Sequence, residues 1–168
     1  MMLKPIIVQV VIDKPLTQGF DYLWGEERLG PPAFAERLLE AAGACLAHDA
    51  AALMIFHPAA PPAVLVDRLK PAERAWLYGD YLSGVYALSP FFRAAQRLKA
   101  PRVARVREIA PKGFAQSEYH RRYFARIGVD DMIGLLIPAS DAETVFMSFS
   151  RSTDALFWRT RAARRSPF

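Results

Sequence analysis

Residues 130–151 read DDMIGLLIPASDAETVFMSFSR, and this stretch predicts two neighbouring strands of a sheet. Segment 130–138 is almost continuously apolar, as a strand buried on both faces would be. In segment 144–151, Val145, Met147 and Phe149 would share one face, with Thr144, Phe146, Ser148 and Ser150 on the other. The polar linker ASDAE between the two segments predicts a turn. We therefore expect an antiparallel pair of strands here.

A second pair of strands is predicted earlier in the chain. Residues 50–57, AAALMIFH, form an apolar run of strand length, and residues 63–67, AVLVD, read as its hairpin partner. The intervening HPAAPP is not expected to continue the first strand, because proline has no N–H to donate to a neighbouring strand. Residues 102–109, RVARVREI, alternate as a further strand would.

Helical patterns separate these strands. From Pro32 onward, Phe34, Leu38, Leu39 and Ala42 recur at helical spacing. A helix is also predicted over 71–82, with Trp76, Leu77 and Tyr81 inward and Glu73, Arg74 and Asp80 outward. Two more are expected at 89–98 and 117–128. Ser89 and Ser117 are suitable N-caps, Pro90 suits a first turn, and Gly128 suits a left-handed helix end.

Two hairpins with helices between them indicate an α+β domain, an antiparallel five-stranded sheet flanked by helices. A further strand is expected at residues 5–13, PIIVQVVID, followed by a loop rich in glycine and proline. We predict three parts: an atypical N-terminal strand and loop at 1–31, the main domain at 32–151, and a basic tail at 152–168.

The composition is that of a globular protein in a reducing compartment. The chain has 168 residues, of which 52% are hydrophobic and 23% charged, and a single cysteine, Cys45. No apolar run is long enough to span a bilayer and no signal-peptide pattern is seen, so we expect a cytoplasmic protein. The net charge of +5 is concentrated in residues 151–168, which hold five arginines and one aspartate. The nearly neutral remainder does not favour nucleic-acid binding.

A search for catalytic or metal-binding patterns finds none. The three histidines are not paired at helical spacing, and no phosphate-binding loop, dinucleotide fingerprint or nucleophile elbow occurs. Cys45 lacks an identifiable activating partner, and the adjacent Asp130 and Asp131 would point to opposite faces of a strand. We therefore expect neither an enzyme nor a cofactor nor a metal site.

The remaining signal is a concentration of aromatic side chains in YLSGVYALSPFFRAAQRL, residues 81–98. These rings can fill an ordinary core, which periodicity alone favours, or they can line a pocket for a small organic molecule. The candidate pocket residues, with two polar neighbours included, are Trp76, Asp80, Tyr81, Tyr86, Ser89, Phe91 and Phe92.

Two stretches carry a resemblance to a known family. Residues 80–96, DYLSGVYALSPFFRAAQ, and 110–138, APKGFAQSEYHRRYFARIGVDDMIGLLIP, resemble the N-terminal sensory domain of LuxR-type transcriptional regulators, an autoinducer-binding-like module of GAF/PAS-like architecture. The resemblance extends from about residue 34 to residue 151. It implies a ligand-sensing, dimeric domain that binds a small apolar or amphipathic molecule.

The resemblance also implies roles for particular residues. In the acyl-homoserine-lactone receptors of this family, a Trp, a Tyr and an Asp followed by Pro hold the lactone carbonyl and the amide. Trp76 and Ser89 keep the outer spacing of that pattern and Pro90 follows. Asp80 takes the middle position with Tyr81 one place away, and Ser89 replaces the carboxylate. A hydroxyl is a weaker acceptor than a carboxylate, so a different small molecule, or none, fits better than an acyl-homoserine lactone.

The two ends of the chain depart from the family. Residues 151–168 contain no helix-turn-helix pattern, so we expect no DNA binding by this chain alone. Residues 8–24, VQVVIDKPLTQGFDYLW, resemble the start of the primosomal replication-restart helicase over fewer than twenty residues. Ligand sensing is thus the first functional hypothesis. The alternatives are a protein-interaction module that only dimerises, a nucleic-acid binder that uses the helicase-like front, and an enzyme.

Overall fold

The computed structural model describes residues 31–44 and 46–152. The predicted strand 5–13, the helicase-like front, Cys45 and the basic tail lie outside these residues. The described elements, in chain order, are α3 (Pro31–Gly43), β1 (Ala50–His57), β2 (Ala60–Arg68), α4 (Pro71–Trp76), η1 (Leu77–Tyr81), η2 (Val85–Leu88), α5 (Pro90–Ala95), β3 (Arg102–Arg105), α6 (Val106–Ile109), η3 (Phe114–Gln116), η4 (His120–Phe124), α7 (Ala125–Ile127), β4 (Val129–Pro138) and β5 (Thr144–Ser152).

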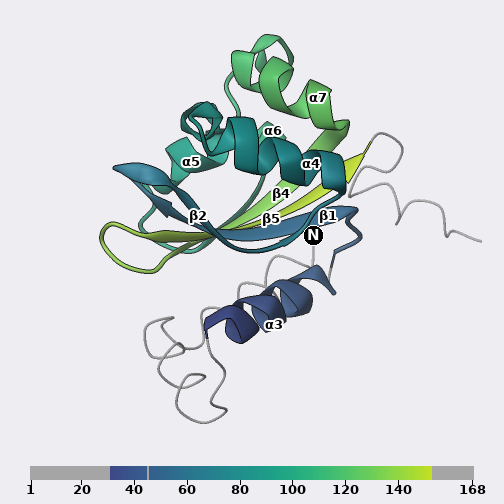
Figure 1. Ribbon diagram of the computed structural model, residues 1–168. Coiled ribbons are helices and arrows are strands. Elements are labelled where there is room, and N and C mark those ends of the chain that lie inside the picture. The colour runs from purple at the N-terminus through teal and green to yellow at the C-terminus, as the bar shows by residue number, and fades with distance from the viewer. Residues whose placement is uncertain (1–30, 45, 153–168) are drawn as a thin grey trace, which may run out of the picture.

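The five strands form one antiparallel sheet in the order β2-β1-β5-β4-β3. The two predicted hairpins therefore meet in the middle, where β1 pairs with β5. Helices α4 to α7 lie over one face of the sheet and α3 lies alone over the other (Figure 1). The predicted α+β class, with an antiparallel five-stranded sheet flanked by helices, is confirmed.

Each face of the sheet has its own core. The α4–α7 side, which we call the aromatic face, buries most of the rings, including Phe56, Phe91 and Phe146. The α3 side, which we call the aliphatic face, buries Leu39, Leu53 and several valines, isoleucines and alanines with a single phenylalanine, Phe149. The alternation predicted for the last strand is confirmed, because Val145, Met147 and Phe149 all face α3.

The predicted end of the first strand at His57 is confirmed, but its hairpin partner begins earlier than the predicted residue 63. Strand β2 already begins at Ala60 and includes both Pro61 and Pro62. The reason is that β2 is an edge strand, where a missing N–H on the solvent side leaves no partner unsatisfied. The pairing of β2 with β1 is irregular at this point, between Ile55 and His57.

Two helical predictions also need correction. The helix over 71–82 changes at Trp76 from an α-helix to the π-helical turn η1. Glu73 was predicted to face outward, but it is buried, because its carboxylate accepts a hydrogen bond from the Lys70 N–H at 3.1 Å and closes the first turn. Segment 102–109 is a strand only as far as Arg105, and its second half is the short helix α6.

The predicted helix caps are confirmed. The Ser89 hydroxyl accepts from the Phe92 N–H at the start of α5, and the Ser117 hydroxyl accepts from the His120 N–H at 3.1 Å. Gly128 ends α7 in the left-handed conformation with φ 63°, which glycine adopts without steric cost. None of the helices in the described residues is long and apolar enough to cross a bilayer.

Candidate ligand site

The first π-helical turn places two large rings on the same side of the α4–η1 segment. Trp76 and Tyr81 are five residues apart, and in a regular α-helix their side chains would diverge by about 140°. The wider turn between them brings the ring centroids to 5.3 Å, with both side chains buried. π-helical insertions of this kind are frequent at functional sites in proteins generally.

The second π-helical turn does the same in a distant part of the sequence. Tyr119 and Phe124, again five residues apart, flank η4 and are both buried, with centroids 5.9 Å apart. The two turns meet through Tyr123, whose ring stacks on Trp76 at 4.3 Å and lies 6.0 Å from Tyr81. The rings of 76, 81, 119, 123 and 124, with Ser89, are called the ring site below.

The remaining predicted rings connect this site to the sheet. Tyr86 lies 6.4 Å from Tyr81 and 5.0 Å from Phe92, and Phe92 lies 5.3 Å from Phe56 of β1. Phe91 is completely buried against Phe146 of β5, at 5.0 Å. Six of the seven predicted site residues therefore belong to one continuous cluster or to its edge.

Asp80 is the exception. Its carboxylate is exposed and forms an ion pair with Arg126 of α7, with Oδ2 and Nη1 2.8 Å apart. This placement follows the helical pattern, which put Asp80 outward, and not the expectation that it forms the polar end of a pocket. The polar group within the cluster is Ser89, which is almost fully buried.

The rings predicted to face a cavity contact one another. Trp76 lies against Tyr81 and Tyr123, and Phe91 and Phe92 lie against rings of the sheet. A groove of about 830 Å³ exists in the described part, but it lies beyond the ring site, next to the end of α5. The predicted site rings thus pack against one another, and this groove does not include them.

The polar atoms of the ring site are buried in an almost wholly apolar environment. Burial raises the pKa of Tyr81 and of Tyr119 above the usual value of 10.0, and the nearby Ser89 hydroxyl partly opposes both shifts. Burial also raises the pKa of Tyr123. All three phenols are thus protonated donors at neutral pH.

Trp76 holds the one buried indole donor at this site that lacks a partner. Its Nε1–H accessible surface is nearly zero and no hydrogen-bond acceptor meets it among the described residues. A buried donor without an acceptor costs about 1–3 kcal/mol. An acceptor supplied from outside, such as a carbonyl oxygen, would remove that cost.

Three residues of the ring site were missed by the sequence reasoning, namely Tyr119, Tyr123 and Phe124. Their helical periodicity is visible in SEYHRRYFARIG, and the family resemblance includes that stretch. Nothing in the sequence pairs them with residues about forty positions earlier, because that contact depends on how two separate helical turns pack over the sheet.

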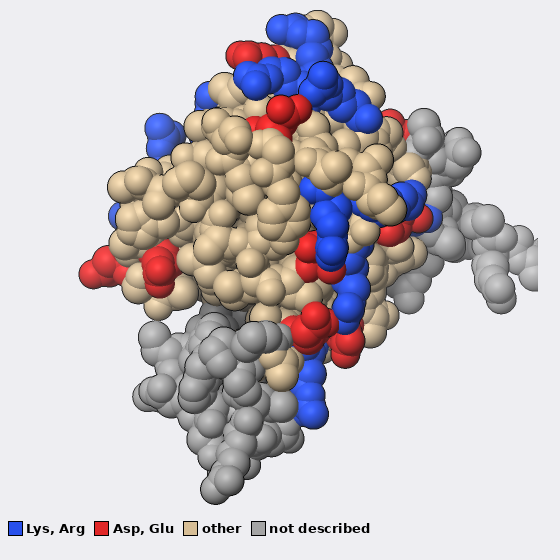
Figure 2. All heavy atoms as spheres, viewed as in Figure 1, with Lys and Arg blue, Asp and Glu red and all other residues tan. Residues whose placement is uncertain are grey.

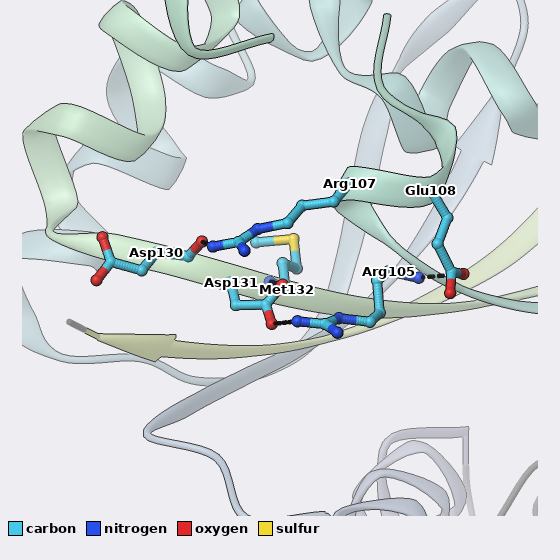
Figure 3. A network of polar contacts seen from close by, with 6 residues as sticks. All are labelled: Arg105, Arg107, Glu108, Asp130, Asp131 and Met132. Atoms are coloured by element: carbon cyan, nitrogen blue, oxygen red, sulfur yellow. Dashed lines mark hydrogen bonds and ion pairs between the residues drawn. The ribbon is translucent and has the colours of Figure 1, made fainter. Parts of the chain in front are cut away.

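Asp131 was also missed as a structural residue. It is fully buried in β4 and forms an ion pair with Arg105 of β3. Figure 3 shows this pair within a small network, where the Glu108 carboxylate accepts from the Arg105 backbone N–H and Arg107 reaches the Asp130 carbonyl. The partner of Asp131 comes from another strand, so the adjacent pair Asp130–Asp131 does not act as a unit.

Metal chemistry has no visible basis in the described residues. Within 31–44 and 46–152, no three histidine, cysteine, aspartate or glutamate side chains gather closely enough to hold a metal ion.

The fold is that of an α+β domain in which several short helices and the single helix α3 cover opposite faces of a five-stranded antiparallel sheet. Two solved structures share this fold, and both come from LuxR-type regulators. The ligand-binding domain of VqsR from Pseudomonas aeruginosa matches with a TM-score of 0.61 and 21% identity, over 83% of this chain and 80% of that one. SdiA from Escherichia coli matches with a TM-score of 0.51 and 15% identity, over 91% of this chain.

The likeness to these two structures is one of fold. The chain spans 58% of the length of SdiA. No protein-family model and no curated protein sequence matches the chain. The predicted resemblance to LuxR-type sensory domains is confirmed at the level of architecture.

Proposed function

We propose that this domain senses a small amphipathic molecule that binds in the ring site, as part of a LuxR-type regulatory system. The observation that carries the proposal is the buried Trp76 Nε1–H with no acceptor among the described residues. Buried donors in folded proteins are rarely left unpaired. A ligand that carries a hydrogen-bond acceptor would pair with this one.

The neighbouring groups indicate the chemistry of the ligand. The walls are aromatic, so they favour an acyl chain or an aryl group. The donors are the Trp76 indole and the phenols of Tyr81 and Tyr119, so the ligand should carry a carbonyl or another neutral acceptor. No carboxylate takes the place of Ser89, and Asp80 is engaged with Arg126 at the surface.

Tyr123 is the natural entry point for such a ligand. It is only half-buried, whereas Trp76, Tyr81 and Tyr119 are buried, and its ring covers the indole of Trp76. Rotation of this one side chain would uncover the indole and leave the sheet in place.

Thermal unfolding with a library of acyl-homoserine lactones, fatty acids and aryl acids tests the proposal. A ligand at 100 times its Kd adds about 2.7 kcal/mol, which raises Tm by several degrees. Trp76→Phe removes the N–H and keeps a ring, so it should weaken binding about tenfold, as the loss of one hydrogen bond does. Asp80→Asn, on the surface, is the control and should bind as the wild type does.

Two results would overturn this proposal. If Trp76→Phe and Asp80→Asn both bind as the wild type does, the indole is not the recognition group. If no compound in the library shifts Tm, and mass spectrometry of the purified protein finds no retained small molecule, sensing itself is wrong.

The second candidate function is an interaction module that dimerises without a ligand. It is favoured by the mutual contacts of the rings, which can complete a core by themselves. A dimer in light scattering together with a flat thermal-shift profile would support it. We expect either form of the domain, taken as this chain alone, not to retard DNA in a gel.

A further inference from the structure

A groove of about 830 Å³ lies between the end of α5 and the start of β3, apart from the ring site. Its apolar floor comes from several separate segments and includes Leu88, Ala94, Leu98 and Ile109. It is not lined by any aromatic ring, and the volume is in the range of binding sites in proteins.

The charges around this groove are all of one sign. Arg93, Arg97, Lys99 and Arg102 line it, and no aspartate or glutamate does. Within the described residues, none of these four forms an ion pair, and only Arg93 has a recorded hydrogen bond, from its Nε to the Ala87 carbonyl at 3.3 Å.

Other arginines of the domain behave differently. Arg68, Arg74 and Arg126 each contact a carboxylate. Figure 2 shows this neutralisation, with positive and negative side chains next to one another from the top of the molecule down towards α3. The four cations around the apolar floor have no such counter-charge among the described residues.

We propose that this groove binds an acidic amphipathic peptide segment of a partner protein, with apolar side chains on the floor and carboxylates on the four cations. Charge complementarity selects an anionic occupant. Single-stranded nucleic acid is disfavoured because no ring is present for base stacking. A membrane surface is disfavoured because the cations surround a concavity and do not form a flat patch.

The test uses a fluorescein-labelled peptide in which leucine and glutamate are spaced as in an amphipathic helix, with fluorescence anisotropy on the full chain. We expect binding that weakens as the salt rises from about 50 mM to about 300 mM. The double reversal Arg97→Glu/Lys99→Glu should weaken binding at least tenfold. A scrambled peptide of the same composition should bind less tightly than the patterned one.

The matched control is Arg107→Glu/Arg121→Glu, which makes the same change of net charge outside the groove. Circular dichroism and thermal unfolding confirm that both double variants fold. Unchanged binding by this control supports the groove. Equal weakening by both double variants would overturn the proposal, because the effect would then come from overall charge.

Two further arms test the kind of partner. If a single-stranded oligonucleotide or a vesicle of phosphatidylserine binds more tightly than the patterned peptide, and the Arg97→Glu/Lys99→Glu variant loses that binding, a peptide is the wrong occupant. Leu98→Ser changes the floor and no charge. It should weaken binding of the peptide but not of the oligonucleotide or the vesicle. An unchanged affinity for the peptide would also contradict the proposal.

Discussion

The two faces of the sheet bury their side chains in different ways. The aliphatic face is covered by α3 alone, and the buried polar groups at its margin, Asp131 and Arg105, are paired with each other across β4 and β3. The aromatic face is covered by several short helical pieces and two π-helical turns. It buries an indole donor at Trp76 that no described residue satisfies. The buried charges on one face are paired with each other, and the other face has an indole donor without a partner among the described residues.

The difference indicates which face of the sheet is the better candidate for a ligand site. A face that consists of interlocking aliphatic side chains has little to gain from a guest molecule. A face with large rings, buried hydroxyls and an unpaired donor gains a hydrogen bond when a suitable guest arrives. The following predictions test this contrast, beginning with the largest expected effect.

Loss of the ion pair at the aliphatic face should have the largest effect. Asp131→Ala leaves Arg105 partly buried without its carboxylate, and we expect a loss of about 3–5 kcal/mol in the free energy of unfolding, measured by urea denaturation. The double variant Asp131→Leu/Arg105→Met removes both charges and should recover most of that loss. If the double variant is as unstable as the single one, the pair itself is not the cause.

Crowding of the aromatic face should have an intermediate effect. A Cβ added at Gly134 of β4 would collide with the Phe91 ring and come within 2.7 Å of Phe146. Gly134→Val should therefore cost about 1–3 kcal/mol of stability in thermal or urea unfolding, or more if Phe91 cannot move. The matched control is Gly79→Ala, where nothing lies within 4 Å of the new atom, and we expect no loss there. Equal effects of the two changes would contradict tight ring packing around Gly134.

The buried phenols should produce a smaller effect that depends on pH. The pKa of Tyr119 is raised on folding, so the unfolded chain releases this proton above pH 10 while the folded chain retains it. The stability that Tyr119 contributes is therefore fully present below pH 10 and is lost as the pH rises further, by about 1.4 kcal/mol per pH unit.

Tyr119→Phe isolates this contribution. Between pH 9 and about pH 11, the free energy of unfolding of the variant should fall by about 1 kcal/mol less than that of the wild type. Urea denaturation at each pH measures this difference. Tyr78→Phe is a surface comparison, because Tyr78 is half exposed and its phenol donates to Asp67. Identical pH profiles for the wild type and Tyr119→Phe would show that this phenol ionises as readily in the folded protein as in the unfolded one.

The local patterns of the sequence were sufficient for the α+β class and for most elements. Alternation in 144–151 predicted which residues share a face, and the serine and glycine positions predicted the helix caps, because these features depend on neighbours within a few residues. The same reasoning failed at Pro61 and Pro62, since a proline is excluded from a central strand but not from an edge strand. Which strand forms the edge is decided by the whole sheet.

The candidate site also combines features that the sequence predicts with features that it does not. The sequence by itself determined the apolar pattern, the aromatic content around residues 76–92 and the cap at Ser89, because each of these is written in adjacent residues. The tertiary structure alone decided that Tyr123 lies on Trp76, that Asp80 faces Arg126, and that Asp131 meets Arg105. These contacts join segments far apart in the chain. Their geometry depends on π-helical turns and sheet order, which no local spacing rule specifies.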